Sequence, residues 1–186
     1  MKPFKVIFAT DEDLGIGKNQ GLPWHLKGDM RYFRDWTTGN GRNAVIMGRV
    51  SYFSMPPRFR PLPNRLNVVL SSNTNLALPH EVLHQTSFNQ ALETCSAMPE
   101  IEEIWIAGGS SVYEEAMAHP LCEAIHWTQV TGRFGCDTFV PDFRCGYEEV
   151  ERSEPMEENG ISYVYTIHHR SPGREMTNPV KESTVF

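Results

Sequence analysis

Short apolar segments alternate with helical patterns along most of this chain, and that alternation limits the possible folds more than any other feature. Residues 4–9 are an almost continuous apolar run, as expected of a strand covered on both faces. Residues 26–38 have the spacing of an amphipathic helix, which the segment Gly39-Asn40-Gly41 is predicted to end. The order of these elements predicts an α/β fold rather than separate helical and sheet regions.

Further apolar segments repeat this pattern along the chain. We expect additional strands at residues 44–47, 66–70, 82–84, 104–107 and 124–130. Helices are expected after Gly48, after Ser87 as an N-cap, and from Ser110. Residues 147–153 and 161–168 flank a polar turn at residues 157–160, which predicts a final antiparallel pair. The predicted fold is a mostly parallel central sheet with an antiparallel C-terminal edge strand and about four flanking helices.

Length and composition favour one folded domain. The chain has 186 residues, of which 40% are hydrophobic, enough for one sizeable core. We assign residues 1–170 to this domain and residues 171–186, which lack periodicity, to a disordered tail. The apolar start of the chain soon meets acidic residues, so it is interpreted as a first strand and not as a signal peptide.

Charge and cysteine content narrow the class of protein further. The net charge is −6 with no basic block, which argues against a nucleic acid or an anionic membrane as partner. No apolar run approaches the ~20 residues of a membrane helix. The four cysteines form no CxxC pair and are interpreted as reduced thiols of a cytoplasmic protein. The seven histidines show no metal-ligand spacing, so no metal is predicted.

An aspartate on the apolar side of a helix is the first candidate for chemistry. In the helix from residue 26, Asp29 shares one side with Leu26, Met30, Phe33 and Trp36. A structural role, with the carboxylate bonded to a backbone amide, is one interpretation. The alternative is functional: a glycine-flanked loop precedes the helix and can act as a lid, beneath which burial would raise the pKa of the carboxyl group.

Glycines at the ends of two predicted strands are the second candidate. Residues 107–111, Ala-Gly-Gly-Ser-Ser, lead from a strand into a helix, and residues 47–51, Met-Gly-Arg-Val-Ser, do the same. Such junctions let a phosphate approach the backbone. Ser71-Ser72-Asn73 and Arg65 flank another strand, where they could bind a phosphate and a carboxylate. Tight turns, serine N-caps and a solvated arginine are the structural alternatives.

Taken together, these motifs resemble the dihydrofolate reductase family over residues 4 to about 169. The resemblance is carried by Ile7-Phe8-Ala9, Gly15-Ile16-Gly17, Leu22-Pro23-Trp24, Asp29 with Phe33, residues 45–49, residues 60–65, residues 108–113, Thr128 and residues 137–141. It implies NADPH-dependent reduction of 7,8-dihydrofolate to 5,6,7,8-tetrahydrofolate by a cytoplasmic monomer that antifolates inhibit.

The resemblance also implies roles for individual residues. Asp29, supported by Trp24 and Thr128, would bind the pterin and promote protonation of its N5. The substrate site would further comprise Ile7, Phe8, Met30, Phe33, Met55, Leu62, Ala107 and Arg65, the last for the glutamate α-carboxylate. NADPH would be surrounded by Ala9, Ile16, Gly17, Leu22, Gly48, Arg49, Val50, Ser51, Leu70, Ser71, Ser72, Asn73, Gly108, Gly109, Ser110, Ser111, Val112 and Tyr113. A cis peptide is expected between Gly108 and Gly109.

Three positions depart from the family's pattern. Ala107 replaces a larger aliphatic residue and should widen the substrate site. Val50 and Asn73 stand where relatives often carry more polar or basic residues, which leaves Arg49, Ser51 and Ser72 to distinguish NADPH from NADH. Two other functions stay open at this point: a reductase of the same fold acting on a ribosylated pyrimidine, and a non-catalytic folate- or nucleotide-binding protein.

Overall fold

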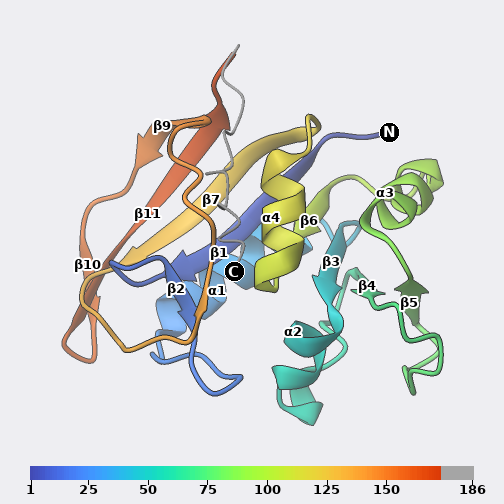
Figure 1. Ribbon diagram of the computed structural model, residues 1–186, viewed down its shortest axis with the longest axis horizontal. Coiled ribbons are helices and arrows are strands. Elements are labelled where there is room, and N and C mark those ends of the chain that lie inside the picture. Colours follow the sequence, from blue (N-terminus) through green and yellow to red (C-terminus); the bar gives the residue numbers. More distant parts are fainter. Residues whose placement is uncertain (173–186) are drawn as a thin grey trace, which may run out of the picture.

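The computed structural model describes residues 1–172, and a nine-stranded sheet forms their centre (Figure 1). The strand order is β10-β11-β7-β1-β6-β3-β4-β5, with β9 also paired to β11. The parallel strands are β1 (Phe4–Thr10), β3 (Ala44–Gly48), β4 (Leu66–Leu70), β5 (Val82–Gln85), β6 (Ile104–Ile106) and β7 (Cys122–Val130). Strand β11 (Ile161–Arg170) runs antiparallel to β7, so the predicted fold class is confirmed.

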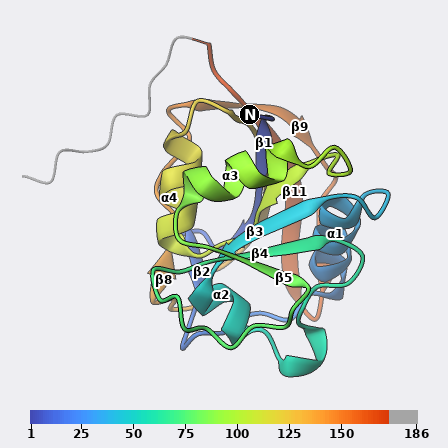
Figure 2. The same cartoon turned by 90° about the vertical axis from the view of Figure 1, so that its right-hand side faces the viewer.

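Helices cover both faces of this sheet. Figure 2 shows α1 (Lys27–Thr38) on the opposite side of the strands from α4 (Ser110–Ala118). The side chains of α1 pack into one apolar cluster together with Tyr52 of α2 (Arg49–Ser54). Those of α3 (Phe88–Ala97) and α4 pack into a second cluster on the other face. As predicted, Ser87 caps α3 by accepting a hydrogen bond from the amide of Gln90.

Alternation along β1 determines which residues reach each face. Val6 and Phe8 belong to the cluster beneath α3 and α4, whereas Ile7 belongs to the cluster beneath α1. Successive side chains of a strand point to opposite faces, so a continuous apolar strand can serve both layers. The same alternation on β7 directs His126 and Thr128 toward α1.

The C-terminal part of the sheet is more divided than the sequence predicts. In place of one hairpin, β9 (Tyr147–Arg152) and β10 (Met156–Glu158) both pair with β11, which therefore is not the edge strand. Residues 153–155 interrupt the outer strand, where Pro155 has no amide hydrogen to donate. Asn159 and Gly160 both have positive φ and form the turn between β10 and β11.

A small second sheet was not predicted at all. Strand β2 (Gly15–Gly17) pairs antiparallel with β8 (Thr138–Phe139), which joins the loop before α1 to the loop after β7. Both strands are too short to show alternation in the sequence. A third short element, the 3₁₀ helix η1 (Pro57–Phe59), follows α2.

Contacts with the domain continue past the predicted boundary at residue 170. Ser171 is buried, and its amide donates a 3.0 Å hydrogen bond to the carbonyl of Gly146. The remainder of the predicted disordered tail, residues 173–186, lies outside the described residues. All four cysteines are free. Within residues 1–172, no helix combines the length and apolar character needed to cross a membrane.

Candidate active site

Asp29 and Thr128 meet between α1 and β7. Asp29 is the third residue of α1, and Thr128 extends from β7 on the face that α1 covers. The hydroxyl of Thr128 donates a hydrogen bond of 2.7 Å to Oδ1 of Asp29. Two residues 99 positions apart are thereby joined at the point where the sequence places a carboxylate on an apolar helix side.

Burial sets the acidity of this carboxyl group. It raises the pKa of Asp29 to about 6, while the hydrogen bond from Thr128 acts in the opposite direction. The low polarity of the surroundings disfavours the charged form, and a donor to the carboxylate favours it. Asp29 therefore changes its protonation close to neutral pH, which suits a group that assists a proton transfer.

Aromatic side chains next to Asp29 form a cluster that the sequence did not reveal. The ring of Tyr32 stacks on Tyr165 with centroids 3.9 Å apart, and its hydroxyl lies 3.2 Å from Nδ1 of His126. Burial, assisted by the charge of Lys5, lowers the pKa of His126 to about 3. His126 is neutral, so Nδ1 can accept the hydrogen bond from Tyr32. The only sequence signal was its position two residues before Thr128 on one strand face.

The predicted substrate residues are only partly brought together. A common cluster on the α1 face contains Ile7, Phe33, Met55, Leu62 and Ala107. The side chain of Met30 is 47% exposed and lies outside that cluster.

The prediction for the side chain of Phe8 is wrong. Its ring packs on the other face of the sheet, with its centroid 5.3 Å from Tyr113 and 5.5 Å from Phe143. Because it follows Ile7 on the same strand, the pleat directs it away from the α1 side.

Arg65 is held in place without a carboxylate partner among the described residues. Its Nε donates to the carbonyl of Pro63 at 2.9 Å, and its Nη1 donates to the hydroxyl of Thr37. Burial, and secondly the nearby charge of Arg34, lower the pKa of Arg65 to about 10. The group is still a cation at neutral pH, and an anionic ligand would relieve both effects.

The loop from Asp11 to His25 leads from β1 to α1 and is fastened at both of its ends. Asp11 is buried, and its carboxylate accepts hydrogen bonds from the amides of Gly15 (2.8 Å) and Phe134 (3.1 Å). Trp24 is also buried, with its ring centroid 5.3 Å from that of Phe134. Its indole Nε1 has no hydrogen-bond partner within residues 1–172, which leaves a buried donor available. Leu22, between these anchors, is 56% exposed.

Glycines create close backbone contacts where β3 and β6 end. The peptide between Gly108 and Gly109 is cis, as expected, and Gly48 donates from its amide to the carbonyl of Gly108 at 2.7 Å. A Cβ at Gly109 would lie only 3.0 Å from Oγ of Ser51. Helix α4 begins directly afterwards at Ser110, and its N-cap residue makes no side-chain hydrogen bond. This arrangement fits a phosphate-bearing ligand, because an uncapped helix N-terminus directly follows glycines whose backbone a ligand can approach closely.

The other predicted cofactor residues lie at neighbouring strand ends. Arg49, Val50, Ser72 and Asn73 are exposed, just beyond β3 and β4. Tyr113 is buried, and its hydroxyl donates to the carbonyl of Ile7 at 3.0 Å. The remaining members lie on or next to four elements: Ala9 on β1, Ile16 and Gly17 on β2, Leu70 and Ser71 at the end of β4, and Ser111 and Val112 on α4.

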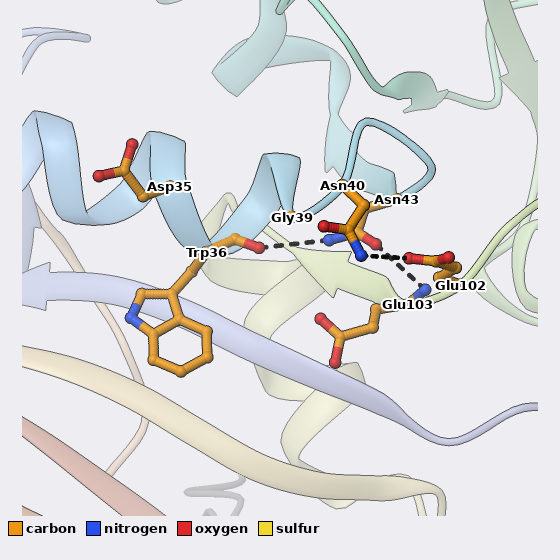
Figure 3. A pocket seen from close by; sticks show the side chains of 7 residues that line it. All are labelled: Asp35, Trp36, Gly39, Asn40, Asn43, Glu102 and Glu103. Atoms are coloured by element: carbon orange, nitrogen blue, oxygen red, sulfur yellow. Dashed lines mark hydrogen bonds between the residues drawn. The ribbon is translucent and has the colours of Figure 1, made fainter.

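A separate pocket lies at the opposite end of β3 and β6 (Figure 3). Its acidic members already have partners: Asp35 pairs with Arg34, Glu102 with Arg42, and Glu103 with Lys5. Asn43 closes the pocket floor by donating to the carbonyl of Trp36 and accepting from the amide of Glu103. None of the residues predicted for substrate or cofactor lines this pocket.

Known proteins resemble this chain in sequence and in fold. A family model described as dihydrofolate reductase matches residues 3–170. The chain is 41% identical to a dihydrofolate reductase of Drosophila melanogaster, over 90% of this chain and 97% of that protein. It is 38% identical to a bifunctional dihydrofolate reductase-thymidylate synthase of Arabidopsis thaliana, where 90% of this chain covers 31% of the longer protein. A dihydrofolate reductase from Enterococcus faecalis, solved with NADP(H), superposes with a TM-score of 0.78 at 30% identity, covering 91% of this chain and 96% of that one.

Proposed function

The chain belongs to the dihydrofolate reductase family, and we propose that Asp29 is the group on which its reaction depends. The reaction is the NADPH-dependent reduction of 7,8-dihydrofolate to 5,6,7,8-tetrahydrofolate. A hydride is added to C6 of the pterin and a proton to N5. Tetrahydrofolate then carries the one-carbon units used to make thymidylate. The single observation that supports the role of Asp29 is its contact with Thr128 in an apolar setting that raises the pKa of the carboxyl group to about 6.

Asp29 binds the pterin edge and makes its reduction easier. An ionised carboxylate accepts hydrogen bonds from the 2-amino group and from N3, which orients the ring. The same negative charge favours protonated N5, and protonation makes C6 electrophilic. Thr128 holds the carboxylate in place, and the free indole donor of Trp24 supports a water molecule or the ligand.

Apolar side chains and one cation bind the rest of the substrate. Ile7, Phe33, Met55, Leu62 and Ala107 line the ring and its aromatic extension, with Met30 at the exposed side. Phe8 borders this site through its backbone alone. Arg65 binds the α-carboxylate of the glutamate, since its planar guanidinium has no carboxylate of the described chain to pair with. The same surface accepts antifolates.

The glycine-rich strand ends hold NADPH, which when bound supplies the hydride for C6. Gly48, Gly108 and Gly109 let the backbone approach the pyrophosphate, and Ser110, Ser111, Val112 and Tyr113 continue that contact along α4. Arg49, Ser51 and Ser72 bind the 2′-phosphate, flanked by Val50, Leu70, Ser71 and Asn73. Ala9, Ile16, Gly17 and Leu22 cover the nicotinamide and exclude water beneath the lid.

The setting of the enzyme follows from the same family assignment. We infer a cytoplasmic monomer whose catalytic domain comprises residues 1–170, with residues 171–186 as an extension without a catalytic role. The residues assigned here to substrate and cofactor all come from that domain.

Replacement of Asp29 by Asn tests the assignment. The amide has the same shape but no charge, so kcat/KM for dihydrofolate should fall by the ~10²–10⁴-fold typical of a lost acid–base group. Activity is followed as loss of NADPH absorbance at about 340 nm. Asp35→Asn is the matched control, because Asp35 is exposed on the same helix and pairs with Arg34. Full turnover by Asp29→Asn at neutral pH would show that another group does this work.

A further inference from the structure

The first turn of α1 is held by a distant carboxylate and not by a cap of its own. Leu26 occupies the N-cap position and makes no side-chain hydrogen bond. Glu158, at the end of β10, instead accepts from the amide of Lys27 through Oε1 (2.8 Å) and from the amide of Gly28 through Oε2 (3.0 Å). Amides in a first helical turn have no partner within the helix. One side chain 130 residues away therefore satisfies two of them.

The same hairpin touches this turn at two further points. The side-chain amide of Asn159 donates to the carbonyl of His25 at 3.2 Å. Tyr163 of β11 packs so closely on Gly28 that a Cβ there would lie 2.2 Å from the phenol oxygen. Contacts from β10 and β11 thus fix the backbone immediately before Asp29.

We propose that Glu158 is a positioning residue for catalysis, which acts by holding the helical turn that carries Asp29. This inference rests on the role proposed for Asp29. The next residue after the two amides that Glu158 binds is Asp29 itself, so a loosened turn moves the carboxylate directly. Displacement of a reacting group by about 1 Å can cost roughly 10²-fold in rate.

The charge of Glu158 suits this task near neutral pH. The hydrogen bonds from the amides of Gly28 and Lys27 lower the pKa of Glu158. The carboxylate is therefore ionised wherever Asp29 titrates, and both of its oxygens remain acceptors. Its position at the positive end of α1 also favours the charged form of Glu158, and Asp29 lies in the same first turn.

Glu157 provides a matched control on the same turn. It is an exposed glutamate adjacent to Glu158 on β10, and its side chain makes no hydrogen bond or ion pair to the described residues. Glu157→Gln removes one negative charge from the hairpin without touching α1. It separates the effect of overall charge from that of the two amide contacts.

The experiment compares Glu158→Ala, Glu158→Gln and Glu157→Gln. We expect kcat/KM for dihydrofolate to fall about tenfold in the alanine variant and about threefold in the glutamine variant, whose carbonyl still accepts one bond. Glu157→Gln should match the unmodified enzyme. The Kd of NADPH, measured by quenching of tryptophan fluorescence, should stay within about twofold in all three, because the glycines of that site lie on other elements.

Several outcomes would overturn the inference. One is equal activity of Glu158→Ala and Glu157→Gln. Another is a loss of NADPH affinity in Glu158→Ala as large as its loss of kcat/KM, which would indicate general destabilisation. A readout without activity is amide hydrogen exchange, which should accelerate at Lys27 and Gly28 and not in α4. Unchanged exchange at both amides would also contradict it. If Asp29→Asn were fully active, the proposed function of Asp29 would fail, whatever the exchange at these amides showed.

Discussion

The hydroxyl of Thr128 lies 2.7 Å from Oδ1 of Asp29, and it is the one side-chain donor that the described residues offer to this carboxyl group. Burial and this hydrogen bond affect the pKa of Asp29 in opposite directions. Thr128 therefore both orients the carboxylate and limits how weak an acid it becomes.

Replacing Thr128 by Val should raise the pKa of Asp29 further above its value of about 6. Valine has nearly the same shape as threonine but cannot donate a hydrogen bond, so the ionised carboxylate loses its partner. We expect the pKa of Asp29 to rise by about one unit as a result. The measurement is a titration of the ¹³C-labelled Asp29 carboxyl by NMR. Thr131→Val, on an exposed residue just after β7, is the control. A pKa that stays the same or falls in Thr128→Val contradicts this account.

Asp29→Asn should make the unliganded protein more stable at alkaline pH. A carboxyl pKa raised from 3.8 to about 6 means that the folded state holds the proton more tightly than the unfolded state. Ionisation of the buried Asp29 therefore lowers the free energy of unfolding. This loss is absent below the unfolded pKa, grows as pH rises, and is complete above about pH 6. We expect the free energy of unfolding to rise by about 1–3 kcal/mol at pH 8, with no gain near pH 4. Urea unfolding at both pH values measures it, and an equal gain at both would exclude this origin.

Local patterns in the sequence identified most elements, because each depends on neighbours along the chain. The spacing of residues 26–38 predicted α1, and the apolar runs predicted β1, β3 and β4 close to their observed bounds. Asp29 stood out because a carboxylate interrupted an apolar stripe. The resemblance, and not the spacing, pointed to Thr128 as its companion.

Features that depend on distant pairing were not predictable in this way. Alternation places Ile7 and Phe8 on opposite faces of β1, but a continuous apolar run does not specify which of the two faces α1. Glu158 gave no local signal either, since its partners lie 130 and 131 residues away. The β2–β8 pair likewise joins two segments that are too short to be recognised singly.

Asp11→Asn should loosen the lid and weaken NADPH binding. Burial alone would raise the pKa of Asp11, yet hydrogen bonds from Phe134, Gly15, Cys136 and Asp13 lower it overall. The side-chain amide of Asn has one acceptor oxygen and cannot accept from all four donors. Some of the hydrogen bonds that hold the loop at residue 11 are therefore lost. We expect the Kd of NADPH to rise about threefold to tenfold, because Ile16 and Gly17 follow directly.

The control for the lid is Asp142→Asn, which removes an exposed carboxylate whose one partner within residues 1–172 is Arg144 of its own loop. The effect of Asp11 also has a defined pH range. Since its folded pKa is lowered, its stabilisation is present above the unfolded pKa of about 3.8 and is lost as pH falls through the folded value. An Asp11→Asn enzyme with unchanged NADPH affinity at pH 7 would show that the hydrogen bonds of Asp11 do not support NADPH binding.

Arg49→Ala should reduce the preference for NADPH over NADH. Only NADPH carries the 2′-phosphate, and a charge-assisted bond to it contributes about 1.5–3 kcal/mol, or roughly tenfold to a hundredfold in the ratio of kcat/KM values. The control is Arg42→Ala, because Arg42 pairs with Glu102 at the far end of β3. If the ratio is unchanged in Arg49→Ala, then Ser51 and Ser72 recognise the phosphate without it.

Gly28→Ala should impair catalysis even though alanine favours helices by about 1 kcal/mol over glycine. A Cβ at residue 28 would lie 2.2 Å from the hydroxyl oxygen of Tyr163, and because the Tyr163 ring is buried we expect the first turn of α1 to shift. That shift would stretch both bonds to Glu158 and displace Asp29. We expect kcat/KM for dihydrofolate to fall by about tenfold or more, with NADPH affinity retained.

Tyr163→Phe provides the test of this explanation, because it removes only the oxygen that the new methyl group would meet. In the Gly28→Ala/Tyr163→Phe double variant the nearest atoms to the added Cβ would be about 3.4–3.5 Å away, an ordinary contact. The double variant should recover most of the lost kcat/KM, and the higher helix propensity should then appear as a higher Tm. If the double variant is no more active than Gly28→Ala alone, contact with the Tyr163 hydroxyl is not what requires glycine at residue 28.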